Sequence, residues 1–108
     1  MRARSGCVAA MALLLSMGAA GADDRAGQGR QKAAQCVACH GLQGFAPNPT
    51  FPHLAGQNAA YLEVQLRQFR AGERYHPLMT PVAETLSDQD IDELAAYYSE
   101  LGALSEAP

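Results

Sequence analysis

Hydrophobic residues recur at helical spacing in two segments of the chain. The first segment, from about Asn58 to Ala71, carries an apolar stripe of Tyr61, Leu62, Leu66 and Phe69, and Gly72 follows as a stop signal. The second begins at Ser87, which can cap a helix, and ends at Gly102. Its stripe consists of Ile91, Leu94, Ala95, Tyr98 and Leu101. Both patterns predict amphipathic helices that bury one face.

The remaining segments are less regular, and none of them alternates as a strand would. A further helix is expected from about Ala26 to His40. The segment from Gly41 to Gly56 is rich in glycine and proline and is expected to be a loop. A second loop is expected from Glu73 to Leu86, where two prolines occur. The sequence therefore predicts an all-α protein of three to four short helices joined by loops.

The N-terminus has a different hydrophobic pattern. Arg2 and Arg4 precede an apolar run from Val8 to Met17, and Ala20-Gly21-Ala22 places small residues before Asp23. This layout is typical of a secretory signal peptide, and its apolar run is short for a transmembrane helix. We expect residues 1–22 to be cleaved, which leaves 23–108 as one domain without a membrane anchor. A retained anchor is the alternative.

The charge of the remaining domain bears on its partners. Without Arg2 and Arg4, six of the eight basic residues remain against eleven acidic ones, a formal charge of −5. Such a surface is a poor match for nucleic acid. The domain is also near the lower size limit for an apolar core alone, so a bound apolar cofactor would add to its stability.

The segment Cys36-Val37-Ala38-Cys39-His40 suggests which cofactor that is. Two thiols one helical turn apart followed by an imidazole form the attachment signature of a c-type haem. Cys36 and Cys39 share a face and can reach the vinyl groups along one edge of a porphyrin, while His40 is the expected proximal iron ligand. A disulfide between the two cysteines is the alternative in an exported chain.

Three residues are candidates for the second iron ligand. Met79 is the only methionine after the predicted cleavage site, and it stands between Pro77 and Pro81 in a segment of restricted conformation. His53 and His76 are the other candidates, although an exposed loop histidine is the ordinary reading of each. A lone methionine can also fill a core. We favour Met79, because a stiff segment helps to hold a weak iron–thioether bond.

These motifs together resemble the small soluble bacterial class I cytochromes c, particularly single-haem cytochrome c-553 and one half of the two-domain c-four type. The resemblance covers nearly all of residues 29–101. It rests on Gly29 before the haem motif, on CVACHG at 36–41 and FPHLAGQ at 51–57, and on LRQFRAGER at 66–74 and MTPVAETLSDQDIDELAAYYSEL at 79–101. The resemblance implies the cytochrome c fold around one covalently attached haem c.

The resemblance also implies two contacts. The first and last helices should cross at Gly29, with Tyr97 or Tyr98 as its neighbour. The backbone carbonyl of Pro52 should accept a hydrogen bond from the His40 ring, which would fix the orientation of the imidazole. From the sequence alone, Pro52 is simply a loop residue.

The resulting functional hypothesis is a periplasmic one-electron carrier with histidine and methionine on the iron, rather than an enzyme. Its expected partners are redox proteins, such as a dehydrogenase or a terminal oxidase or reductase. One alternative is a permanent cytochrome subunit of a periplasmic dehydrogenase complex. Another is a haem enzyme or gas sensor with an open sixth site. Arg67, Arg70 and Arg74 could contribute to docking, or could simply form a solvated helix face with contacts to the haem propionates.

Overall fold

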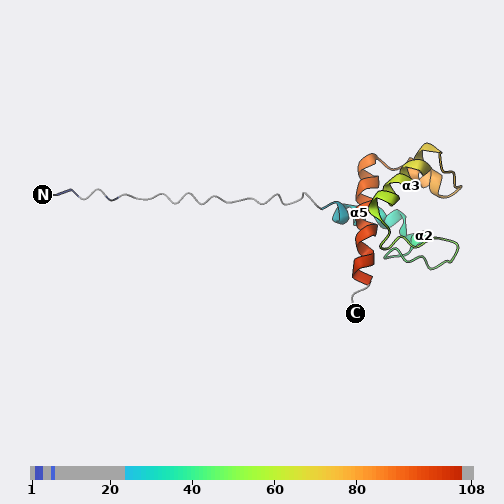
Figure 1. Ribbon diagram of the computed structural model, residues 1–108, viewed down its shortest axis with the longest axis horizontal. Helices are drawn as coiled ribbons and strands as arrows, with labels where there is room; N and C mark the ends of the chain where they lie inside the picture. The colour runs from blue at the N-terminus through green and yellow to red at the C-terminus, as the bar shows by residue number, and fades with distance from the viewer. Residues whose placement is uncertain (1, 4–5, 7–23, 106–108) are drawn as a thin grey trace.

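The computed structural model describes residues 2–3, 6 and 24–105, and every regular element in those residues is helical. The predicted signal peptide, apart from residues 2, 3 and 6, lies outside them, as does its cleavage site. The elements in chain order are α1 (Arg25–Lys32), the 3-10 turn η1 (Ala33–Gln35), α2 (Val37–His40), α3 (Ala59–Ala71), α4 (Met79–Glu84) and α5 (Asp88–Ser105). Helix α5 is the longest and forms the axis of the domain (Figure 1). No helix in the described part of the chain is long and apolar enough to cross a membrane.

The crossing of α1 and α5 depends on Gly29, which is buried. A Cβ atom at this position would collide with the backbone carbonyl of Glu93 and would lie 2.8 Å from Cβ of Tyr97. The backbones can approach this closely only because glycine has no side chain. The predicted crossing is thus present, and its neighbour on α5 is Tyr97 rather than Tyr98.

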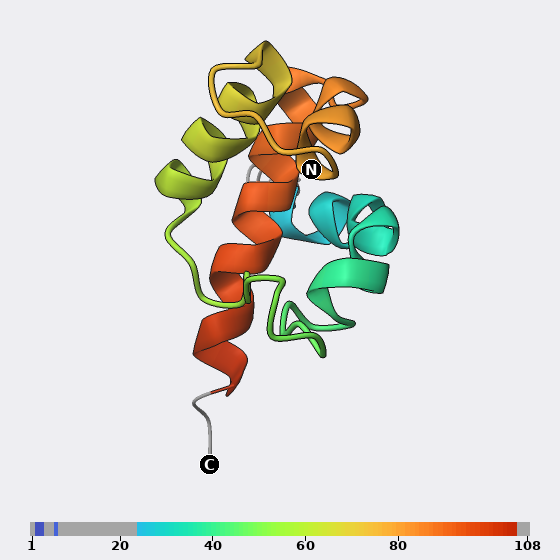
Figure 2. The ribbon, with the colours of Figure 1, turned by 90° about the vertical axis from the view of Figure 1, so that its right-hand side faces the viewer.

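The core lies where α5 meets α3 and the segment that follows α1. Five of its buried side chains belong to the apolar stripes of the two predicted amphipathic helices, and the other two come from η1 and from the residues between α4 and α5. The buried side chains are Ala33, Leu62, Leu86, Ile91, Leu94, Ala95 and Tyr98. Helix α3 runs along one side of α5, while α2 and the loop after it lie on the other side (Figure 2).

Local signals define both ends of α3 and the start of α5. The Asn58 side chain accepts a hydrogen bond from the Tyr61 N–H at 3.1 Å and caps α3, and Gly72 ends that helix at φ +77°. At the start of α5, Ser87 Oγ accepts from the Asp90 N–H at 3.0 Å, and the Asp90 carboxylate accepts from the Ser87 N–H at 2.9 Å. The predicted stop at Gly72 and the predicted cap at Ser87 are confirmed, and the Asn58 cap is an additional signal.

Two arginines on α3 connect it to α5. Arg67 Nη2 lies 2.9 Å from the Asp92 carboxylate, and Arg70 Nη2 lies 2.6 Å from that of Asp88. Both guanidinium groups therefore have partners within the protein. Because their charges are already paired, Arg67 and Arg70 fit a plain helix face better than a docking surface.

The prediction of one continuous helix over residues 26–40 was wrong. Helix α1 ends at Lys32, and the N–H of Cys36 bonds to the carbonyl of Ala33 at 2.8 Å, which closes a 3-10 turn. The chain then begins the short helix α2, which turns away from α5 (Figure 2). The break lets α1 pack on α5 while Cys39 and His40 face a different region.

The structure corrects two further boundaries. The expected loop over 73–86 contains α4, in which Pro81 is the third residue; a proline fits there because the first-turn N–H groups have no helical acceptor. Gly102 does not end α5, which continues to Ser105. It instead lies against Gly56, where a Cβ atom on either glycine would collide with the other backbone. A tertiary contact therefore explains Gly102.

Candidate functional site

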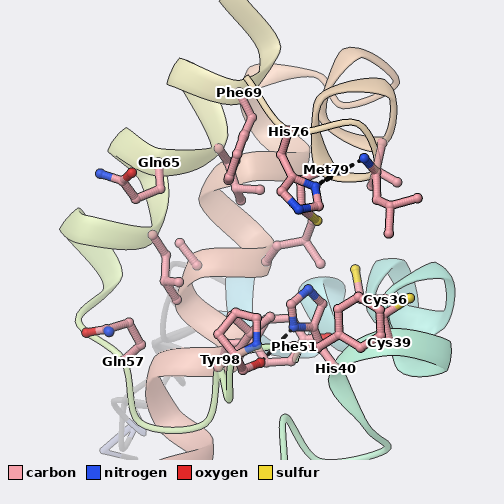
Figure 3. A pocket seen from close by; sticks show the side chains of 18 of the residues that line it. Cys36, Cys39, His40, Phe51, Gln57, Gln65, Phe69, His76, Met79 and Tyr98 are labelled. Atoms are coloured by element: carbon pink, nitrogen blue, oxygen red, sulfur yellow. Dashed lines mark hydrogen bonds between the residues drawn. The ribbon is translucent and has the colours of Figure 1, made fainter. Parts of the chain in front are cut away.

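A cavity of about 300 Å³ opens between α2, the loop after it, α3 and α4. Cys36 and Cys39 are free thiols in the structure, both half-buried, and both line this cavity. Their sulfur atoms lie along one edge of it (Figure 3). The two cysteines are not joined to each other, so the structure does not contain the disulfide that was the alternative to haem attachment. Most of the other lining residues are apolar, and they include Phe51, Leu54, Leu62, Leu66, Phe69, Leu78, Val82 and Leu94.

His40 reaches the cavity from the last position of α2 and is only 6% exposed. Its Nδ1 lies 2.9 Å from the backbone carbonyl of Pro52, which is the contact that the family resemblance implied. A carbonyl can only accept, so Nδ1 carries the proton and Nε2 keeps its lone pair. The ring is thus held with a metal-binding nitrogen free, and Gly41 at φ +83° turns the chain directly after it.

Met79 is the first residue of α4 and lines the cavity from the side opposite His40. Its sulfur atom faces the His40 ring across the open space (Figure 3). His53 and His76 also line the cavity. His53 Nδ1 already accepts the Ala46 N–H at 2.8 Å, so this ring nitrogen is occupied. The structure therefore brings all three candidate ligands to one cavity.

The edge of the cavity away from the cysteines is polar. Gln57 and Gln65 lie there, on and beside α3 (Figure 3). Arg74 also lines the cavity; its Nη1 lies 2.6 Å from Gln65 Oε1, and its guanidinium stacks 4.5 Å above the Phe69 ring. A flat molecule with reactive vinyl groups at one edge and carboxylates at the other matches this division. The sequence did not identify Gln65 as a residue of this site. Gln65 lies four residues after Tyr61 and four before Phe69, on the same face of α3.

Tyr98 and Cys36 meet at the buried side of the cavity. The Tyr98 side chain is 4% exposed, and its hydroxyl group has no hydrogen bond among the described residues. Burial raises the pKa of Tyr98, and the neighbouring Cys36 thiol raises it further. Burial also raises the pKa of the Cys36 thiol. A buried hydroxyl that faces a thiol, which is a weak hydrogen-bonding group, at the wall of a cavity is consistent with a site formed around a bound group.

These observations show that the residues fit a haem c. Two thiols at one edge match its vinyl groups, and a guanidinium and amides at the other match its propionates. An imidazole with a free Nε2 and a thioether face each other across the space between. The helical fold together with this cavity defines a class I c-type cytochrome.

Comparison with known proteins identifies the family. The model of the family described as cytochrome c oxidase, cbb3-type, subunit III matches residues 22–97. The chain therefore belongs to this family of cytochrome c domains.

Individual relatives agree with that assignment. Cytochrome c-554(548) of Halomonas halodenitrificans is 48% identical over 77 residues, which cover 68% of this chain and 93% of the relative. The thiosulfate dehydrogenase electron acceptor of Stutzerimonas stutzeri is 42% identical over 90 residues, covering 79% of this chain and 42% of the relative. The crystal structure of reduced cytochrome c4 from Pseudomonas stutzeri superposes with a TM-score of 0.65 at 43% identity, covering 68% of this chain and 44% of that one.

The chain is thus an electron-transfer cytochrome of the all-α cytochrome c fold that binds haem c. It spans less than half the length of the cytochrome c4 and of the thiosulfate dehydrogenase electron acceptor that it matches.

Proposed function

We propose that this chain is a periplasmic one-electron carrier with one haem c, held by thioether bonds to Cys36 and Cys39. His40 and Met79 would hold the iron in this proposal. Residues 1–22 direct export and are removed, and 23–108 form the single domain. The observation that carries the proposal is the opposition of His40 Nε2 and the Met79 sulfur across a cavity edged by both thiols.

The residues of the chain have separate tasks in this function. Pro52 accepts the Nδ1 proton of His40, which keeps the imidazole oriented and makes Nε2 a better donor to the metal. Met79 supplies a thioether, which favours ferrous iron. With His40 and Met79 both bound to the iron, the protein would keep small molecules away from it. The haem iron supplies reversible exchange of one electron between its ferrous and ferric states.

The apolar walls of the cavity act in the same direction as the thioether. Ferric haem carries one more positive charge than ferrous haem, and a charge is costly to hold among apolar side chains. Residues such as Leu62 and Phe69, both 8% exposed, therefore raise the reduction potential by keeping water away. Arg74, at the polar edge, offers a counter-charge for a propionate.

Substitution of Met79 tests the ligand assignment. Met79→Ala should lose the weak near-infrared band of the iron–sulfur bond, lower the potential and let carbon monoxide bind the ferrous protein. His53→Ala is the matched control, because His53 lines the same cavity but its Nδ1 is held by Ala46. It should keep the band. An unchanged potential in Met79→Ala, or loss of the band in His53→Ala, would contradict the assignment.

A permanent subunit of a dehydrogenase complex is the second candidate. It is favoured by the similarity to a protein named for accepting electrons from thiosulfate dehydrogenase. The cofactor site would be the same, and only the lifetime of the association would differ. Gel filtration of the native protein from periplasmic extract separates the two: a carrier elutes at the size of residues 23–108, whereas a subunit elutes with its dehydrogenase.

A further inference from the structure

His76 makes contacts that its position in a loop does not suggest. Its ring lines the cavity beside Met79 (Figure 3). Ring nitrogen Nδ1 lies 3.1 Å from the backbone nitrogen of Leu78 and 3.3 Å from that of Met79. Both N–H groups can only donate, so Nδ1 is their acceptor. The side chain therefore holds the backbone of the proposed ligand itself.

The backbone of His76 is held in turn by Thr80. The His76 N–H donates to Thr80 Oγ1 at 2.9 Å, and the Thr80 N–H donates to the His76 carbonyl at 3.0 Å. Thr80 is 5% exposed, and its hydroxyl lies 3.4 Å from the Arg74 carbonyl. Met79 thus stands between two residues that are bonded to each other, and the buried Thr80 anchors both to the domain.

The same contacts argue against His76 as the iron ligand. An acceptor nitrogen carries no proton, so the proton of the neutral ring is on Nε2. A protonated nitrogen has no lone pair for a metal. For Nε2 to bind iron, the proton would have to move to Nδ1, which would then face two N–H donors and lose both hydrogen bonds. His76 is therefore arranged to support Met79 and not to replace it as the iron ligand.

We propose that His76 is a positioning residue for Met79: by accepting the N–H groups of Leu78 and Met79, it keeps the sulfur directed into the cavity. This inference rests on the proposed function, in which Met79 binds the iron. An iron–thioether bond is weak, so the rate at which another ligand replaces it depends on how firmly the segment is held. Removal of the acceptor should make the segment open more often.

The test is the rate at which added imidazole displaces Met79 from the ferric protein, followed by the loss of the near-infrared sulfur–iron band. His76→Ala removes an acceptor of the kind that caps helices, and it should accelerate displacement about tenfold. His76→Asn should stay within about twofold of the wild type, because an asparagine carbonyl accepts the N–H two residues on. Asn58→Ala is the control: it removes a comparable cap from α3, away from Met79, and should leave the rate unchanged.

Each outcome has a defined meaning. An unchanged rate in His76→Ala would overturn the inference, as would a His76→Asn variant as fast as His76→Ala, since the acceptor would then not be the cause. If His76→Ala does not fold, Thr80→Val takes its place in the same assay, because it removes the acceptor of the His76 N–H. Displacement should then be faster than in the wild type, by less than the tenfold expected for His76→Ala. No acceleration would again overturn the inference. A wild-type protein without the band would instead refute Met79 as the ligand, which is a failure of the proposed function.

Discussion

Replacement of Gly29 by alanine tests how the α1–α5 crossing is formed. At an ordinary helical position this change stabilises a protein by about 0.5–1 kcal/mol, because alanine is the better helix former. Here the new Cβ atom would collide with the carbonyl of Glu93 and approach Cβ of Tyr97 to 2.8 Å. The carbonyl belongs to the backbone of α5 and cannot rotate away, so the helices must separate.

The expected size follows from these opposing effects. Forcing extra atoms into a well-packed contact costs typically about 1–3 kcal/mol, which exceeds the gain in helix propensity. Gly29→Ala should therefore lower the free energy of unfolding by about 1–2 kcal/mol, and the Tm should fall by about 4–8 °C for each kcal/mol in a domain of this size. The sign is opposite to that expected for an exposed helix.

Gly27→Ala is a matched control on the same helix. Gly27 is exposed, and a Cβ atom there would meet only the end of the Asp24 side chain, which is free to rotate. This variant should be as stable as the wild type or more stable. The assay is guanidinium unfolding of the haem-containing protein followed by helical circular dichroism. A Gly29→Ala protein as stable as Gly27→Ala would show that the close approach of α1 and α5 does not require glycine at position 29.

Two further predictions concern charges. The Lys32 ammonium lies 2.5 Å from the carboxylates of Asp90 and Glu93 and is the main cause that lowers both pKa values. In their ionised form these two acids add stability that is fully present above about pH 4.5 and is lost as the pH falls through their lowered pKa values. Lys32→Gln should therefore move the midpoint of acid unfolding to higher pH. An unmoved midpoint would contradict the role given to these ion pairs. Arg74→Gln should lower the reduction potential by tens of millivolts in voltammetry, because it removes a positive charge at the cavity that disfavours ferric iron. Arg67→Gln is the control, because it also removes one positive charge, from a residue of α3 that does not line the cavity. An equal fall in the reduction potential of that variant would show that the position of Arg74 has no special role.

Elements with signals in their own residues could be predicted from the sequence. The ends of helix α3 are set by Asn58 and Gly72, and both signals act within a single turn. The attachment motif is equally local, because the spacing of Cys36, Cys39 and His40 is itself the chemical requirement. Such features do not depend on the rest of the fold.

Features that depend on distant parts of the chain could not be predicted in the same way. Gly102 is the kind of residue that commonly ends a helix, but its role here is to allow close contact with Gly56 on another segment. Pro81 is a helix breaker in most positions and is compatible with the first turn of α4. The acceptor for His40 is a backbone carbonyl, which every residue possesses, so only the family resemblance pointed to Pro52. Gln65 gave no signal without knowledge of what lies opposite its helix face.

In the function proposed here, Cys36 and Cys39 hold one haem c on a chain that starts after residue 22. Intact mass spectrometry of the protein purified from the periplasm, together with its pyridine haemochrome spectrum, measures this directly. We expect the mass of residues 23–108 plus a single haem, with neither cysteine open to alkylation. A colourless protein whose cysteines react with an alkylating reagent, or do so only after reduction of a disulfide, would contradict it.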